Sequence, residues 1–100
     1  MPGALAAVDL EALPGVSGKA ACVVYVAMDL GARYRAGAIS QPDYTAQATA
    51  LVATIRGQGG RPNAALESRI DDMIARINAE DPGEDEVRAK AAFCRRALGL

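Results

Sequence analysis

The chain of 100 residues contains no histidine and no tryptophan, only two cysteines, and only four aromatic residues. Without histidine it lacks the commonest general base, the commonest zinc ligand and the usual partner of a nucleophilic serine or cysteine. Two cysteines alone cannot complete a four-thiolate metal site. We therefore expect a protein that is not an enzyme and that needs no metal or other cofactor.

The formal net charge of the chain is −1. This balance does not attract the phosphate backbone of a nucleic acid, and four scattered aromatic side chains give bases no platform on which to stack. No run of about 18 apolar residues occurs, so no segment is expected to span a membrane. These absences leave another protein as the expected partner, with a homo-oligomer as one option.

Alanine-rich composition favours helices. Hydrophobic residues make up 51 % of the chain, and many of them are alanine. Alanine is the best helix former, whereas the β-branched and aromatic residues that favour strands are scarce. We expect an all-α protein, with a short irregular segment at residues 1–16 and a compact four-helix bundle-like domain at residues 17–100.

The N-terminal residues include Ala4-Leu5-Ala6, an A-x-A pattern of the kind that signal peptidase recognises. The basic and long apolar stretches of a complete signal peptide are missing. Residues 1–16 are therefore either the tail of a signal peptide from a longer precursor or a plain alanine-rich tail. The first interpretation places the protein in the periplasm or outside the cell, and the second fits a cytoplasmic protein.

The first helix is expected to start at Ser17, a favourable N-cap, and to stop at Gly37, a favourable residue just after a helix. Its segment 20–28 is apolar on every side. Such a run could be a buried strand, but the pattern continues to Ala36, far beyond the length of a typical strand. A helix that is apolar all round is normally the central one of its fold.

The second helix has the clearest start signal in the chain. Ser40 is an N-cap and Asp43 lies at the third helical position, so the two form an Asp variant of the capping box. Ile39 can pack on Tyr44 as a hydrophobic staple. The helix is expected to run to about Arg56, and its inward stripe consists of Tyr44, Ala48, Leu51, Val52 and Ile55.

Gly57-Gln58-Gly59-Gly60 then interrupts the helical pattern, and a third helix is expected from Pro62-Asn63 onward, with Asn63 as a possible cap. Its buried face consists of Leu66, Ile70, Met73, Ile74 and Ile77.

The fourth helix is expected to begin at Asp81-Pro82-Gly83-Glu84. Asp81 would be its N-cap, with Pro82 at the first and Glu84 at the third helical position. Acidic residues come early in this helix and basic residues late, as the helix dipole favours. The inward face consists of Val87, Ala91, Cys94 and Leu98.

The two cysteines lie near opposite ends of the helical domain, Cys22 in the first helix and Cys94 in the last. In an up-down-up-down bundle these helices are antiparallel neighbours, so the topology brings the cysteines together. A disulfide would close a loop of roughly 70 residues and stabilise the fold by on the order of 4–5 kcal/mol. The alternative is two free thiols that serve as small buried apolar side chains.

Two patterns that could carry chemistry have simpler explanations. The segment Gly15-Val16-Ser17-Gly18-Lys19-Ala20 has the wrong spacing for a phosphate-binding loop, and alanine stands where serine or threonine should bind magnesium. Asp71 and Asp72 point about 100° apart on a helix. The acidic residues between positions 80 and 86 lack the spacing of a calcium-binding EF-hand. We interpret the first pattern as a turn before a helix and the acids as solvated charges.

Four arginines lie where the first two helices end, and they form either an anion site or a complement to the helix dipoles. They are Arg33, Arg35, Arg56 and Arg61.

A helical hairpin pattern over residues 30–51 resembles the signature of the SHOCT family. The matching residues are Leu30, Tyr34, Ala36-Gly37-Ala38-Ile39-Ser40, Asp43-Tyr44 and Leu51. SHOCT segments are short helical hairpins, usually appended to the ends of bacterial proteins, with a suggested role in oligomerisation. Here the hairpin is internal and is followed by two more helices. The resemblance implies a helical association element without catalytic residues.

The sequence thus predicts a small non-enzymatic protein-interaction or structural module, exported and stapled by a disulfide between Cys22 and Cys94. Two alternatives stay open. One is a periplasmic stress chaperone or small inhibitor, which rests on architectural analogy alone. The other is a cytoplasmic phage-type inhibitor or regulator with free thiols.

Overall fold

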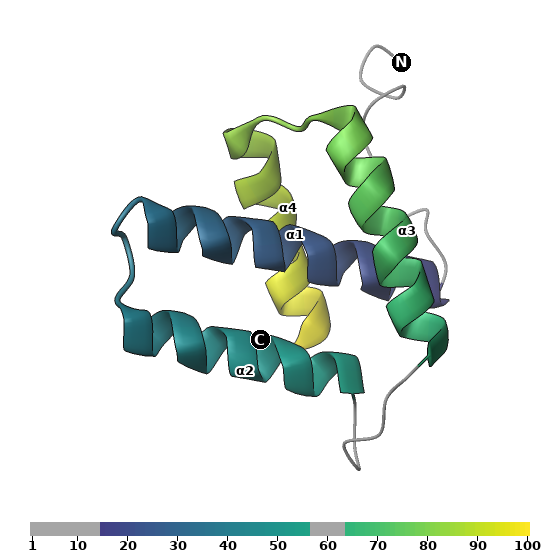
Figure 1. The fold of residues 1–100 in the computed structure, drawn as a ribbon, viewed down its shortest axis with the longest axis horizontal. Helices are drawn as coiled ribbons and strands as arrows, with labels where there is room; N and C mark the ends of the chain where they lie inside the picture. Colours follow the sequence, from purple (N-terminus) through teal and green to yellow (C-terminus); the bar gives the residue numbers. More distant parts are fainter. Residues whose placement is uncertain (1–14, 57–63) are drawn as a thin grey trace.

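The structure, a computed structural model, describes residues 15–56 and 64–100, which contain four α-helices and no strand (Figure 1). The helices are α1 (Gly15–Arg35), α2 (Gln41–Arg56), α3 (Ala64–Glu80) and α4 (Glu84–Leu98). The expected all-α fold is therefore confirmed. The predictions for residues 1–14, for the break at 57–60, for Arg61 and for the cap at Asn63 lie outside the described residues.

Helix α1 is the centre of the fold, as its sequence predicts. Every residue from Ala20 to Val26 is buried, so this stretch has no solvent face. The other three helices each pack against α1, whereas contacts among the three are sparse. In Figure 1, α2 runs antiparallel to α1, while α3 and α4 cross it at steep angles. The arrangement is thus bundle-like around one shared helix rather than a regular up-down bundle.

The buried faces of α3 and α4 largely match the sequence pattern. In α3, Leu66, Met73 and Ile77 are buried and Ile70 is half-buried, but Ile74 is 43 % exposed, so its inward assignment was wrong. The physical reason is that α3 has one substantial neighbour, α1, which does not cover the whole predicted face. In α4, Val87, Ala91 and Cys94 are buried and Leu98 is half-buried, as expected.

Helix α2 buries much less of its predicted stripe. Leu51 is buried, Tyr44, Ala48 and Ile55 are half-buried, and Val52 is 47 % exposed, so the assignment of Val52 to the inward face was wrong. The physical reason is that α2 has one substantial neighbour, α1, which covers only one side of the stripe.

The N-cap prediction for Ser40 is confirmed, because its hydroxyl accepts a hydrogen bond from the Asp43 backbone N–H at 3.2 Å. Asp43 lies in the first turn of α2, where a carboxylate complements the helix dipole. The Tyr44 ring packs against Tyr34 at the end of α1, with 4.6 Å between ring centroids. The staple with Ile39 stays a prediction.

Three other cap predictions were wrong. Helix α1 already includes Gly15, so Ser17 lies within its first turn rather than at its N-cap. Helix α4 has Gly83 as its N-cap and Glu84 as its first residue, with no side-chain cap. Asp81 instead ends α3: its φ is +50°, and its N–H bonds to the Ile77 and Asn78 carbonyls at 3.2 Å each. Because Asp81 ends α3, it does not cap α4, and Gly83 takes the N-cap position instead.

Candidate functional site

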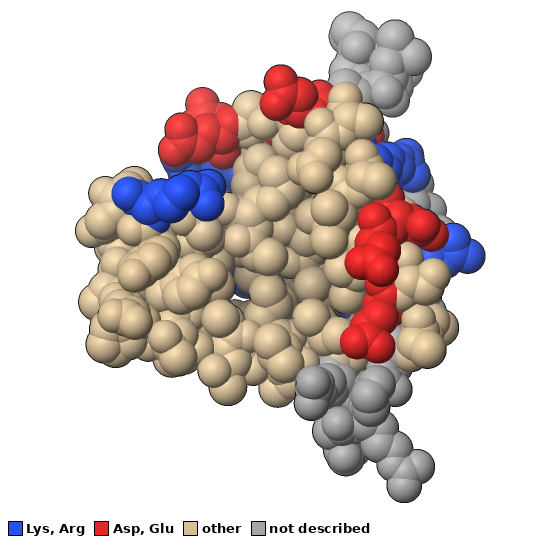
Figure 2. All heavy atoms as spheres, viewed as in Figure 1, with Lys and Arg blue, Asp and Glu red and all other residues tan. Residues whose placement is uncertain are grey.

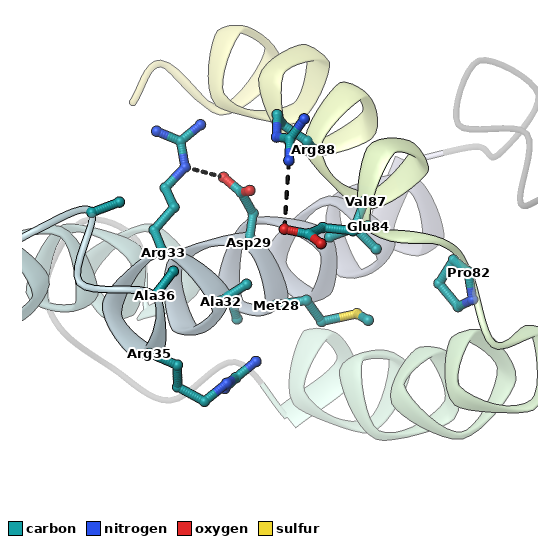
Figure 3. Close-up of a pocket in the computed structure, with 12 residues that line it drawn as sticks. Met28, Asp29, Ala32, Arg33, Arg35, Ala36, Pro82, Glu84, Val87 and Arg88 are labelled. Carbon is teal, nitrogen blue, oxygen red and sulfur yellow. Dashed lines mark hydrogen bonds and ion pairs between the residues drawn. The ribbon is translucent and has the colours of Figure 1, made fainter.

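A groove of about 1000 Å³ lies between the second half of α1 and the start of α4. Its floor consists of Met28 and Ala32 from α1, Ala36 just after the end of α1, and Val87 from α4. Pro82, in the link between α3 and α4, borders one end (Figure 3). Because α1 carries alanines here, no bulky side chain fills the space between the two helices.

Three arginines border this apolar floor, Arg33 and Arg35 from α1 and Arg88 from α4. Figure 3 shows Arg33 and Arg35 leaving α1 on opposite sides. Arg88 binds Glu84 at 3.5 Å and Asp85 at 3.1 Å. Both acidic partners are almost fully exposed, so these pairs are weak and can exchange for other anions.

Arg35 makes no ion pair with any residue that the structure describes. Its guanidinium lies close to Gly31: a Cβ added at this glycine would stand only 3.1 Å from the Arg35 Nη1 atom. Glycine at position 31 thus leaves room for this orientation. The cation is exposed beside the groove and is free to meet an anionic ligand.

A buried ion pair lies at the base of the groove. The Asp29 carboxylate, only 6 % exposed, accepts hydrogen bonds from Arg95 of α4 at 2.7 Å and from Arg33 at 2.9 Å. A buried carboxylate of this kind is tolerated because two guanidinium groups replace its lost hydration. The interaction fixes α4 against α1 and holds the Arg33 side chain at the groove.

A second polar link joins α1 and α4 through Tyr25 and Lys90. Lys90 Nζ donates to Glu86 at 3.0 Å and to the Tyr25 hydroxyl at 3.4 Å, and it lies 5.1 Å from the Tyr25 ring centroid. Burial raises the pKa of Tyr25, although the Lys90 charge opposes the shift. Burial by itself would lower the pKa of Lys90, but its bonds to Glu86 and Tyr25 raise it. Both groups therefore keep their protons at neutral pH, which suits a structural role.

The cysteine pair lies where the sequence places it. Cys22 and Cys94 are both buried, their Cα atoms are 4.9 Å apart, and their sulfurs lie at bonding distance. The Cys22–Cys94 pair, the Tyr25–Lys90 contact and the Asp29–Arg95 ion pair all join the same two helices. The two walls of the groove are thus the most firmly connected elements of the fold.

The structure brings together only part of the predicted arginine cluster. Arg33 and Arg35 border the groove, whereas the side chain of Arg56 and all of Arg61 lie outside the described residues. Arg88 was missed, because nothing local distinguishes it from a surface arginine. Only the crossing of α1 and α4 brings it to the groove that Arg33 and Arg35 also border.

Within the described residues, no group of three or more Cys, Asp and Glu side chains is arranged to hold a metal ion. None of the four helices in that part of the chain is long and apolar enough to cross a membrane. Asp71 and Asp72 are both exposed on α3, in keeping with solvated charges.

Comparisons with protein-family models, with curated proteins and with solved structures find no match. The SHOCT-like pattern therefore rests on its sequence alone, on a segment that spans the end of α1 and most of α2.

Proposed function

We propose that the protein is a small non-enzymatic interaction module that binds an acidic amphipathic segment of a partner protein in the α1–α4 groove. The observation that carries this proposal is the combination of an apolar floor with arginines on both sides. A helix or extended segment that alternates apolar side chains with Asp or Glu matches both features. An inorganic anion would leave the floor unused, and an uncharged ligand would leave the arginines unused.

The charge inventory of the groove supports an acidic ligand. Its lining contains three arginines against two acids, Asp29 and Glu84. Asp29 is already neutralised by Arg33 and Arg95, and Glu84 is an exposed partner that a stronger acidic ligand can displace from Arg88. Arg35 has no competing partner among the described residues.

The connections between α1 and α4 support a binding role. A groove whose walls are fixed before the ligand arrives loses less conformational entropy on binding. A disulfide between Cys22 and Cys94 would fix them most strongly, and such bonds persist in oxidising compartments. We therefore propose export to the periplasm or beyond as the setting of this function.

The groove is tested with a fluorescent helical peptide of about 16 residues that carries leucines on one face and glutamates beside them. Binding is followed by fluorescence anisotropy. The double variant Arg35→Glu/Arg88→Glu should weaken binding at least about tenfold, because two attractive contacts become repulsive. The double control Arg69→Glu/Arg76→Glu makes the same charge change on exposed α3, outside the groove, and should leave the affinity within about twofold.

Two results would overturn this function. A peptide in which lysine replaces glutamate should not bind, so equal binding of both peptides would show that charge does not select the ligand. Equal loss in the groove and α3 variants would show that only the overall charge matters. The proposed export is tested separately by thiol titration of the denatured, non-reduced protein, in which two free thiols would retire the stapled form.

A further inference from the structure

The chain itself contains an acidic amphipathic segment of the kind that suits the α1–α4 groove. Residues 8–13, here named the acidic segment, read Val8-Asp9-Leu10-Glu11-Ala12-Leu13. Apolar and acidic residues alternate over the first four positions, and no lysine or arginine precedes Lys19 in the chain. The acidic segment comes shortly before α1, outside the residues that the structure describes.

This alternation suits an apolar floor with cations at its borders. When a segment binds in an extended form, successive side chains point to opposite sides. Val8 and Leu10 would then face the floor, while Asp9 and Glu11 would stand away from it, at the level of the bordering arginines (Figure 3). One short stretch of sequence thus offers both features that the groove selects.

The number of charges also matches. Arg35 has no ion pair with a described residue, and Arg88 pairs with two almost fully exposed acids that a ligand can displace. In Figure 2, basic side chains gather over the end of α1, at the left of the view, with acidic side chains beside them over the start of α4. Asp9 and Glu11 supply one carboxylate for each of the two available arginines.

The covalent chain is too short to bring the acidic segment into the groove of its own copy. The nearest groove residue on α1, Ala27, lies about 18 Å along the helix from Gly15, and Arg35 lies about 30 Å along it. Glu11 precedes Gly15 by four residues, which span at most about 14 Å. Residues 11–13 therefore cannot lie along this wall of their own groove.

We propose that the acidic segment of a second copy of the chain occupies the α1–α4 groove. This inference rests on the proposed function, to which it adds the identity of the partner. Each copy offers one acidic segment and one groove, so two copies that exchange segments form a closed dimer with two contacts. The partner copy thereby contributes residues that complete the site.

The size of the contact sets the expected strength. A segment of six residues covers well under the roughly 800 Å² per partner that a stable complex buries. We therefore expect a reversible association with a dissociation constant on the order of 100 µM. At low protein concentration the groove is then open to acidic segments of other proteins.

A peptide of residues 7–14 tests the contact directly. The receptor is the full chain with Asp9→Lys/Glu11→Lys, here named the segment variant, whose own segment cannot compete. The labelled peptide should bind it in fluorescence anisotropy, and a peptide with Asp9→Asn/Glu11→Gln should bind at least about tenfold more weakly. Arg35→Glu/Arg88→Glu, here named the groove variant, should lose the wild-type peptide. Equal binding of the two peptides would overturn the inference.

Sedimentation velocity of the full chain, from about 10 µM to about 1 mM at about 150 mM salt, tests self-association. The wild-type mass should rise above the 10.3 kDa of one chain, whereas the segment variant and the groove variant should each stay at that mass. The control Asp71→Lys/Asp72→Lys makes the charge change of the segment variant on exposed α3 and should still associate. A wild-type mass that stays at one chain would contradict the proposal.

Mixing the two variants tests whether the contact joins different copies. The groove variant retains an acidic segment that fits the arginine groove of the segment variant, and the lysine segment of the latter meets the glutamates of the former. An equimolar mixture at about 1 mM should therefore form a heavier species that neither variant forms alone. A mixture that stays at the mass of one chain would rule out exchange between copies.

Failure of this inference can be told apart from failure of the proposed function. The designed peptide with leucines and glutamates, described above, binds the segment variant if the groove takes acidic segments at all. If that peptide binds and the peptide of residues 7–14 does not, the second copy is not the partner, and the proposed function stands. If neither peptide binds, both proposals are wrong.

Discussion

Arg95 and Asp29 lie 66 residues apart in the sequence, yet the Arg95 Nη1 atom donates to Asp29 Oδ2 at 2.7 Å. Arg33, one turn after Asp29 on α1, donates to the same carboxylate oxygen at 2.9 Å. One carboxylate thus serves two purposes: it fixes α4 on α1, and it holds one of the arginines that border the groove.

Asp29→Asn should lower the free energy of unfolding by about 2–4 kcal/mol, because it leaves two guanidinium groups without their anion near the core. Urea denaturation measures the change. The control Asp72→Asn breaks an exposed pair with Arg69 on α3 and should cost under about 0.5 kcal/mol. Similar losses in both variants would show that the Asp29 interaction behaves as a surface pair.

Replacing both cysteines, as Cys22→Ala/Cys94→Ala, should lower the free energy of unfolding by about 4 kcal/mol, since the bond closes a loop with a sequence separation of 72. Urea denaturation with and without reductant measures this. Reductant should destabilise the wild-type chain by a similar amount and leave the double variant unchanged. A wild-type midpoint that does not respond to full reduction would mean that the bond does not contribute to stability.

Stability should fall at high pH because of Tyr25 and Lys90. The pKa of each is raised in the fold, so the folded chain holds more protons than the unfolded chain once the pH passes their ordinary pKa values of 10.0 and 10.5. The contribution is therefore complete below about pH 10 and is lost as the pH rises above it. Tyr25→Phe should flatten the decline in urea midpoint between about pH 9 and about pH 11. An unchanged slope in the variant would contradict this origin.

Two isoleucines of α3 provide a matched test of the core. Ile77 is fully buried, and Ile77→Ala should cost about 2–5 kcal/mol by removing contacts and leaving a cavity. Ile74 is 43 % exposed, and Ile74→Ala should cost under about 1 kcal/mol. Thermal or urea unfolding measures both. The reverse order would mean that α3 is rotated relative to the structure.

Asp81 distinguishes two readings of the link between α3 and α4. If Asp81 closes α3 with φ at +50°, Asp81→Gly should raise the free energy of unfolding by about 0.5–1 kcal/mol, because glycine adopts a positive φ without strain. If Asp81 were instead the N-cap of α4, the same variant would lower the free energy of unfolding by a few tenths of a kcal/mol. The sign of the change in urea midpoint decides between them, and Ser40→Ala, which removes a confirmed cap, should cost about 1 kcal/mol.

The contrast between Ser40 and Asp81 shows what local patterns can predict. Both precede a proline and an acidic residue, yet only Ser40 caps the helix that follows it. Ser40 follows a turn in which Gly37, at φ +74°, has already closed α1, so it is free to begin α2. Asp81 comes directly after α3, whose last carbonyls take up its N–H. The outcome depends on how far the preceding helix extends, which a start signal alone does not determine.

The central place of α1 could be predicted, because an apolar run on all sides of a helix demands neighbours on all sides. Cys22 and Cys94 do meet as predicted, but α4 crosses α1 steeply to bring them together, instead of running antiparallel to it as the sequence argument assumed (Figure 1). The groove could not be predicted, since Arg88 joins Arg33 and Arg35 at one groove only through the way in which α4 crosses α1. The exposure of Val52 could not be predicted from the sequence for a related reason. An apolar stripe predicts a buried face, but here the second neighbour needed to cover it is not supplied by the rest of the described chain.

The sharing of α1 by three otherwise separate partners makes this helix indispensable to the fold. Because α2, α3 and α4 contact one another so little, no pair of helices without α1 can form a core of its own. Backbone amides between Ala20 and Val26 should therefore exchange with deuterium only when the whole molecule opens. Amides on α2, which covers one side of α1, should exchange through local detachment that leaves the other three helices assembled.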